Sequence, residues 1–205
     1  MSDPRARPLH ERDLDPDPFA QFGRWFEEAE AAGTPLPEAM ALATAASSGQ
    51  PSVRMVLLKA FTASGFVFYS DYESRKGREL AETGRAALLF YWHALGRQVR
   101  AEGAVVRLSA AESDAYFATR PLGARVSAAV SRQSQVVPGR EELERRVEEL
   151  GAQLGDADLP RPERWGGYRL EPEAIEFWQH REDRLHDRLR YRRDGDAWRI
   201  ERLSP

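Results

Sequence analysis

Two cationic segments in the first half of the chain have the residue types that bind phosphate. Arg54–Lys59 reads RMVLLK, an apolar run with a cation at each end, and Ser74-Arg75-Lys76 stands at the predicted start of a helix. A helix N-terminus offers free backbone N–H groups and a favourable dipole, to which Arg and Lys add positive charge. Such clusters are more often ordinary surface charge, so they indicate only a candidate anion site.

A second candidate lies further along, where Tyr116 and Arg120 stand four residues apart in a predicted helix. Residues at this spacing share one helix face, and Ser131–Ser134 (SRQS) follows shortly after them. A tyrosine beside an arginine suits anion binding, and it equally suits ordinary cation–aromatic packing. The residues leave both interpretations open.

The third candidate is Glu176–Arg188, which reads EFWQHREDRLHDR. In an extended strand Arg184, His186 and Arg188 point to the same face, because successive side chains alternate. Three potentially cationic groups on one face are costly unless an anion lies against them, and Trp178 is close by in the sequence. We therefore interpret this segment as part of a functional site.

The composition excludes several classes of protein. The 205 residues include no cysteine, which excludes disulfides, thiolate metal sites and a cysteine nucleophile. The formal net charge of −3 argues against nucleic-acid binding. The four histidines lack metal-ligand spacing, so no metal is expected, and the common glycine-rich nucleotide loops are absent. With no apolar run of ~20 residues and no secretory signal, we expect a cytoplasmic protein that does not bind membranes.

The elements that must position these residues are mostly strands. Residues 1–18 hold four of the 13 prolines and predict a flexible N-terminal arm before a single domain over 19–205. A helical apolar stripe begins at Phe19, and short apolar runs divided by turns between residues 40 and 108 favour an antiparallel sheet. Further helices are predicted at 74–82, 109–119 and 141–154, and further strands at 167–170, 175–178, 185–191 and 198–203. The pattern predicts a β-rich α+β domain.

In this order and spacing, the segments resemble the pyridoxamine 5′-phosphate oxidase family, FMN enzymes of vitamin B6 synthesis and salvage. The resemblance runs from about Asp13 to Pro205, and its most specific motif, RLHDR, ends at Arg188. Arg97-Gln98-Val99 and Trp165–Tyr168 add to it. It implies an FMN-binding split β-barrel, antiparallel and Greek-key-like, with flanking helices, and a homodimer that binds FMN at the subunit interface.

The resemblance also implies roles for individual residues, matched position by position. Arg75 and Lys76 are expected to hold the flavin phosphate. The full set of expected FMN contacts is Arg54, Met55, Val56, Leu57, Leu58, Lys59, Tyr69, Ser70, Arg75, Lys76, Gln98, Gln133, Ser134, Trp178 and Arg188. The positions that hold the substrate phosphate are matched by Lys59, Tyr116 and Arg120. Arg184 and His186 match the catalytic pair of the family, which lies over the pyridine ring of the substrate and also binds it.

The implied reaction oxidises pyridoxine 5′-phosphate or pyridoxamine 5′-phosphate to pyridoxal 5′-phosphate. A hydride passes from the substrate's C4′ to the flavin N5, and O₂ reoxidises the flavin and leaves as H₂O₂. The flavin carries the redox step, so the protein supplies binding, orientation and electrostatics. Arg184 and His186 are expected to orient the ring and to assist removal of the O–H or N–H proton.

Two departures from the family pattern fall on the substrate side. The family usually has a phosphate-binding serine where this chain has Ala124, and Arg5–His10 lacks the tyrosine that closes over the substrate in many members. One alternative is therefore a phenazine-biosynthesis oxidase with the same fold and FMN. A second is a split-barrel protein that binds flavin without turnover, and a third is a deazaflavin-dependent reductase on the same fold.

Overall fold

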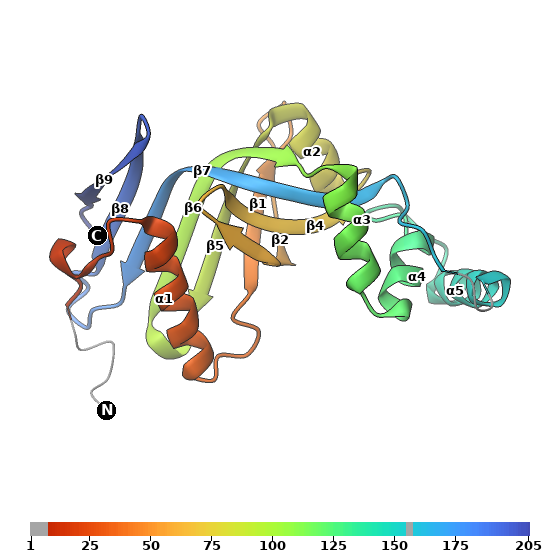
Figure 1. Cartoon of the computed structure of the whole chain (residues 1–205), viewed down its shortest axis with the longest axis horizontal. Coiled ribbons are helices and arrows are strands. Elements are labelled where there is room, and N and C mark those ends of the chain that lie inside the picture. The colour runs from red at the N-terminus through yellow and green to blue at the C-terminus, as the bar shows by residue number, and fades with distance from the viewer. Residues whose placement is uncertain (1–7, 155–157) are drawn as a thin grey trace.

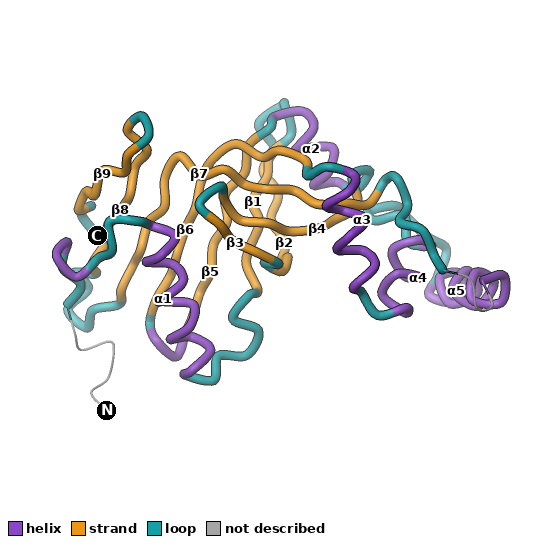
Figure 2. The backbone as a smooth tube through the Cα atoms, in the orientation of Figure 1, coloured by secondary structure: helices purple, strands orange, loops and turns teal. Residues whose placement is uncertain are grey.

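The computed structural model describes residues 8–154 and 158–205, and in this part of the chain nine strands form one curled antiparallel sheet with helices around it (Figures 1 and 2). The strands are β1 (Ala39–Ala45), β2 (Pro51–Leu57), β3 (Ala60–Thr62), β4 (Gly65–Asp71), β5 (Arg85–Trp92), β6 (Arg97–Arg107), β7 (Trp165–Gln179), β8 (Asp187–Asp194) and β9 (Ala197–Arg202). The α-helices are α1 (Pro18–Ala31), α2 (Arg75–Thr83), α3 (Ala110–Thr119), α4 (Leu122–Val130) and α5 (Arg140–Leu154). The expected α+β class and antiparallel pairing are confirmed.

Strand β7 connects the two ends of the sheet. It pairs with β6 over residues 168–179, while its other edge pairs with β4 over residues 165–170 and with β8 over 174–179. Pro172, which has no N–H to donate, lies between these two partners and opposite Gly103. A Cβ on Gly103 would come within 2.0 Å of the Glu171 carbonyl oxygen, so glycine is required there. The sheet therefore divides at the middle of β7 into a β4 side and a β8 side.

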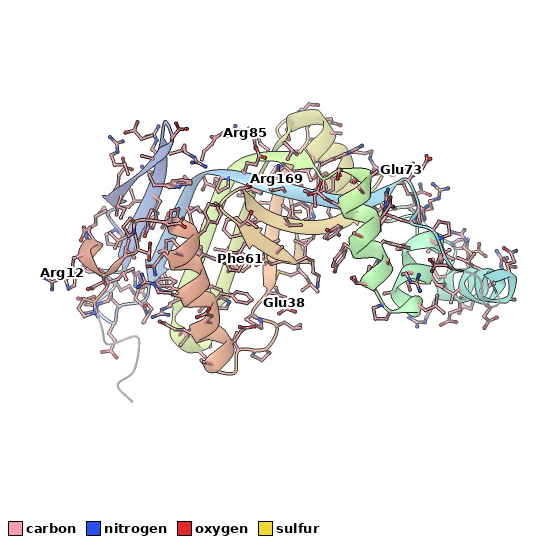
Figure 3. The ribbon with its side chains drawn as sticks, in the orientation of Figure 1. Arg12, Glu38, Phe61, Glu73, Arg85 and Arg169 are labelled. Carbon is pink, nitrogen blue, oxygen red and sulfur yellow. The ribbon has the colours of Figure 1, made fainter. Side chains whose placement is uncertain are left out.

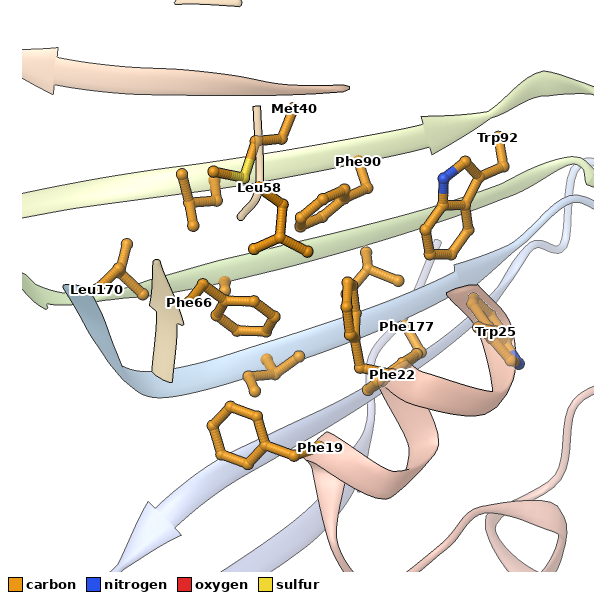
Figure 4. Close-up of a cluster of buried hydrophobic side chains, with 14 of the residues drawn as sticks. Phe19, Phe22, Trp25, Met40, Leu58, Phe66, Phe90, Trp92, Leu170 and Phe177 are labelled. Carbon is orange, nitrogen blue, oxygen red and sulfur yellow. The ribbon is translucent and has the colours of Figure 1, made fainter. Parts of the chain in front are cut away.

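Helix α1 covers one face of the sheet and closes the main core (Figure 4). Asp17 caps the helix by accepting the Phe19 N–H at 2.9 Å, and the predicted apolar stripe is buried. Phe22 is 0% exposed and packs against the rings of Phe26, Phe61, Phe66, Phe90 and Trp92. Phe61 is seen beside α1 in Figure 3. On the same helix, Phe19 packs against Phe66 of β4 and Trp198 of β9, so the helix contacts both sides of the sheet.

The structure differs from the expected elements in four places. The strands predicted at 167–170 and 175–178 are one strand, because β6 pairs with β7 on both sides of the irregularity between Glu102 and Gly103. The strand predicted from Leu185 begins only at Asp187. Helix α4 and the short strand β3 were not predicted, since α4 starts beside the turn-type residues Pro121 and Gly123 and β3 is only three residues long.

Part of the expected N-terminal arm packs on the last two strands. Residues 1–7 lie outside the described part of the chain, but the Leu9 N–H donates to Asp187 Oδ2 at 3.1 Å, and Arg202 forms an ion pair with Glu11 at 2.9 Å. The division into an arm over 1–18 and one domain over 19–205 stays a prediction. Among the described residues, no helix combines the length and apolar character that crossing a membrane requires.

We expect Phe22→Ala to destabilise the protein by about 3–5 kcal/mol, because it removes a fully buried ring from the centre of the cluster. Urea unfolding measures the loss. Val136→Ala is the control, since Val136 is 99% exposed and its change is expected to stay within about 0.5 kcal/mol. A similar small effect for Phe22→Ala would contradict the assignment of this cluster as the main core.

Candidate functional site

A hollow of about 320 Å³ opens between β2, β4, the start of β7, and helices α2 and α3. This volume lies in the range of small-molecule sites. The lining residues are Arg54, Met55, Val56, Leu57, Lys59, Tyr69, Ser70, Lys76, Tyr116, Arg120, Gln133 and Trp165. All of them except Trp165 were expected site residues, so folding brings the first two sequence clusters together.

The start of α2 forms a donor-rich end of this hollow. The Lys76 ammonium donates to Ser70 Oγ at 2.9 Å and to Gln133 Oε1 at 3.0 Å. The Arg75 N–H donates to Ser134 Oγ at 3.1 Å. Burial lowers the pKa of Lys76, and the nearby positive charge of Arg54 lowers it further. This end of the hollow is therefore a set of cationic and hydroxyl donors, as phosphate binding requires.

A buried acid, Glu79, holds two arginines at the same end. It accepts Arg75 Nε at 2.8 Å and Arg54 Nη2 at 3.3 Å, and also the hydroxyls of Thr44 and Ser52 at 2.5 Å each. Burial would raise the pKa of this carboxyl, but the four hydrogen bonds outweigh burial and lower the pKa to about 2. Glu79 is therefore ionised under all ordinary conditions.

An aromatic wall forms the other end of the hollow. The rings of Tyr69 and Tyr116 stack with centroids 3.9 Å apart, and Tyr69 stacks on Trp165 at 5.4 Å. The Arg120 guanidinium lies 4.6 Å from the centre of the Trp165 ring, and burial lowers its pKa. Arg120 Nη1 is buried and has no hydrogen-bond partner within the described residues. A buried cationic donor of this kind indicates a place for an anionic ligand.

The remaining expected site residues lie elsewhere. Cross-strand pairs place Gln98 opposite Trp178, and Trp178 opposite Arg188, where β6, β7 and β8 meet. The Arg188 guanidinium donates to the buried Glu176, with Nε 2.7 Å from Oε1. Part of its charge is therefore balanced inside the protein. Leu58 lies in the hydrophobic core, where it is 5% exposed.

The alternation expected for Arg184, His186 and Arg188 is wrong, because the first two precede the strand. Arg184 has a left-handed backbone with φ of 65°, and the Arg184 N–H donates to the Arg181 carbonyl, so the chain turns here. Next to it, His186 Nδ1 accepts the Arg181 N–H at 3.0 Å. Burial lowers the pKa of His186, with smaller lowering by His180 and Arg184. His186 is thus neutral at pH 7, with its proton on Nε2.

Within one chain the two groups of residues are far apart. Trp165 lines the hollow, whereas Trp178 lies 13 residues further along the same continuous strand, a path of about 40 Å. The start of β7 lies beside α3 and its end lies beside β8, on opposite sides of the molecule (Figure 1). A single ligand in the hollow cannot reach both groups of one chain.

The sequence matches the family model described as pyridoxamine 5′-phosphate oxidase over residues 26–154, and the model described as pyridoxine 5′-phosphate oxidase C-terminal dimerisation region over residues 165–205. The pyridoxine/pyridoxamine 5′-phosphate oxidase of Rubrobacter xylanophilus is 58% identical over 197 residues, which cover 96% of this chain and 91% of the relative. The protein of the same name from Cupriavidus taiwanensis is also 58% identical, over 198 residues covering 96% and 93%.

Two solved structures are similar over nearly the whole chain. PhzG from Burkholderia lata 383, in complex with tetrahydrophenazine-1-carboxylic acid, has a TM-score of 0.90 and 40% identity, covering 97% of this chain and 98% of its own. A pyridoxamine 5′-phosphate oxidase-related, FMN binding protein from Nostoc punctiforme has a TM-score of 0.73 and 17% identity, covering 94% and 98%. The expected split-barrel fold is confirmed.

The low pKa of Glu79 predicts a specific acid sensitivity. Its ionised form stabilises the folded state above pH 4.5, the ordinary pKa, and this contribution is lost as the pH falls towards about 2. The difference in unfolding free energy between the unmodified protein and Glu79→Gln should therefore shrink from pH 5 to pH 3, measured by urea unfolding. Glu148→Gln, on the exposed side of α5, is the control. A difference that stays constant with pH would contradict the assignment.

Proposed function

Because the chain belongs to the pyridoxamine 5′-phosphate oxidase family, we propose that it oxidises pyridoxine 5′-phosphate or pyridoxamine 5′-phosphate to pyridoxal 5′-phosphate, with FMN as cofactor. When bound, FMN supplies the redox chemistry, since its N5 accepts a hydride from the substrate's C4′ and O₂ takes up the two electrons as H₂O₂. The alcohol yields the aldehyde directly. For the amine, water supplies the aldehyde oxygen and the nitrogen leaves as ammonia.

The observation that carries this proposal is that one hollow collects donors for two phosphates. Lys76, which lines the hollow, and Arg75 beside it at the start of α2 suit the flavin phosphate. Ser70, Gln133 and Ser134 accept hydrogen bonds from these two residues and keep hydroxyl and amide hydrogens that can be donated to a phosphate. The second set is Lys59, Tyr116 and Arg120, which line the same hollow. A phosphorylated cofactor and a phosphorylated substrate together account for both sets. An unphosphorylated substrate would leave the second set without a phosphate to bind.

A homodimer supplies the residues that one chain cannot bring to its own hollow. The family model over residues 165–205 describes a dimerisation region. Apolar side chains are exposed on the outer face of β2 and β5, namely Val53, Met55, Leu57, Leu89 and Tyr91. An exposed apolar patch of this kind marks a protein contact. In our proposal the second copy covers this face and places its own Trp178, Arg184, His186 and Arg188 against the FMN.

Arg184 and His186 orient the substrate ring in this arrangement. His186 Nδ1 is occupied by the Arg181 N–H, so the neutral imidazole offers Nε2–H as a donor to the oxygen or nitrogen on C4′. This tautomer makes His186 a hydrogen-bond donor rather than a general base at pH 7. The proton-removal role expected for it from the family resemblance is therefore not part of the proposal, and the O–H or N–H proton of the substrate leaves to water. Arg184 adds a positive charge that the left-handed turn holds in place.

A second candidate function is oxidation of a reduced phenazine carboxylic acid. It is favoured by the similarity to PhzG and by Ala124, where the family's usual phosphate-binding serine is missing. A monocarboxylate carries one negative charge, however, while Lys59 and Arg120 both line the hollow in addition to the flavin-phosphate donors. The phosphate ester is the better match in charge.

Anaerobic mixing of the flavin-loaded protein with pyridoxine 5′-phosphate tests the proposal. We expect the visible flavin absorbance to bleach, to return in air, and to be accompanied by an aldehyde product. Pyridoxine without phosphate is the control and should bleach the flavin far more slowly. A flavin that stays oxidised with both phosphorylated vitamers would contradict the B6 assignment, and bleaching by a dihydrophenazine carboxylic acid alone would support the second candidate.

The tautomer of His186 predicts a pH dependence. Because the pKa of His186 is lowered from its ordinary 6.5, the neutral form dominates at pH 7, and protonation removes the Nδ1 acceptor. We expect kcat/KM to fall only at pH values on the acid side of the ordinary histidine pKa, and His186→Gln to remove this acid limb while lowering activity at pH 8. An unchanged acid limb in the variant would exclude His186 as its source.

A further inference from the structure

We infer that Glu79 is a positioning residue that holds Arg54 and Arg75 ready for the cofactor phosphate. The inference rests on the proposed FMN function, but it concerns a residue that does not line the hollow. Glu79 stands in the second turn of α2, below the hollow, and is 4% exposed. The hollow itself is lined by Arg54 and Lys76, not by Glu79.

The two carboxylate oxygens of Glu79 accept hydrogen bonds from three elements. Oε1 accepts Arg75 Nε from α2, while Oε2 accepts Arg54 Nη2 and the Ser52 hydroxyl from β2 and the Thr44 hydroxyl from β1. Arg54 also donates to the Leu42 carbonyl oxygen at 3.1 Å. One acid thus ties the guanidinium of the strand and the guanidinium of the helix to a common point.

The charges explain why an acid stands there. Arg54, Arg75 and Lys76 bring three positive charges to one end of the hollow, and they would repel one another in the absence of a ligand. The Glu79 carboxylate leaves a net charge of about +2, which matches the phosphate of FMN at −1.5 to −2. The protein therefore holds its phosphate site assembled before the cofactor arrives, which lowers the ordering cost of binding.

Two effects of removing the carboxylate have opposite signs. Loss of a nearby negative charge strengthens the attraction of the site for a phosphate, whereas loss of the common anchor frees Arg54 and Arg75 and weakens phosphate binding. If Glu79 acts by positioning, the loss of the anchor is the larger effect, and FMN binds more weakly to the variant. Riboflavin lacks the phosphate, so its affinity should depend little on Glu79 in either case.

The test measures dissociation constants for FMN and riboflavin by quenching of flavin fluorescence, using the full chain freed of flavin. We expect Glu79→Gln to weaken FMN binding about tenfold, or about 1.4 kcal/mol, with less than a twofold change for riboflavin. Glu79→Asp keeps the negative charge but moves the carboxylate oxygens away from the two arginines. We expect it also to weaken FMN binding while leaving riboflavin binding nearly unchanged. Glu82→Gln, on the same helix but bonded to the Ser47 N–H, is the matched control and should leave both constants unchanged.

Unchanged or tighter FMN binding in Glu79→Gln would overturn the inference, and so would equal losses for FMN and riboflavin, which indicate general damage to the fold. If Glu79→Gln does not fold, the same comparison is made with Glu79→Asp. No substrate is present, so a wrong substrate assignment leaves the test unaffected. An unmodified protein that does not bind FMN more tightly than riboflavin would instead refute the phosphate site of the proposed function.

Discussion

The length of β7 is the constraint on which the rest of the site depends. One continuous strand carries Trp165 at its first residue and Trp178 near its end, and its pairing with β6 over residues 168–179 keeps most of it extended. The exchange of β4 for β8 at Pro172 gives each half of the strand a different neighbour. The proposed site needs both halves and therefore combines two chains, and the exposed apolar residues of β2 and β5 are the surface on which we propose that the second chain packs.

Each half of the proposed site is arranged around a buried glutamate. Glu79 holds Arg54 and Arg75, and Glu176 holds Arg100 at 2.6 Å and Arg188 at 2.7 Å. Buried carboxylates are stable only when they are paired and hydrogen-bonded, and here their partners include Arg54, Arg75 and Arg188, three of the arginines proposed to contact the flavin. The positive charge needed for ligands is thus held in fixed geometry by acids of the chain itself.

Local patterns predicted the fold class, the apolar stripe from Phe19 and the start of α2, because each depends on spacing within a single segment. The residues around the hollow were assigned from the family resemblance, and the structure brings them together, while their roles stay predictions. The turn before β8 was missed because Arg184 adopts a left-handed backbone that its residue type does not signal. Glu79 was missed because its hydroxyl partners, Thr44 and Ser52, lie 35 and 27 residues away, so its burial arises only from tertiary packing. A glutamate in an amphipathic helix otherwise looks like surface charge.

The most direct test of a site shared by two chains is a mixed dimer of Lys76→Ala and His186→Ala. A dimer made of one variant alone has two damaged sites. In Lys76→Ala both sites lose a residue of the hollow, and in His186→Ala both sites lose a residue that is proposed to face the substrate ring. If the two groups come from different chains, random pairing makes half of the dimers mixed, and each mixed dimer has one intact site. The account predicts that the mixture recovers about a quarter of the unmodified activity. A mixture no more active than the average of the two variants would contradict it.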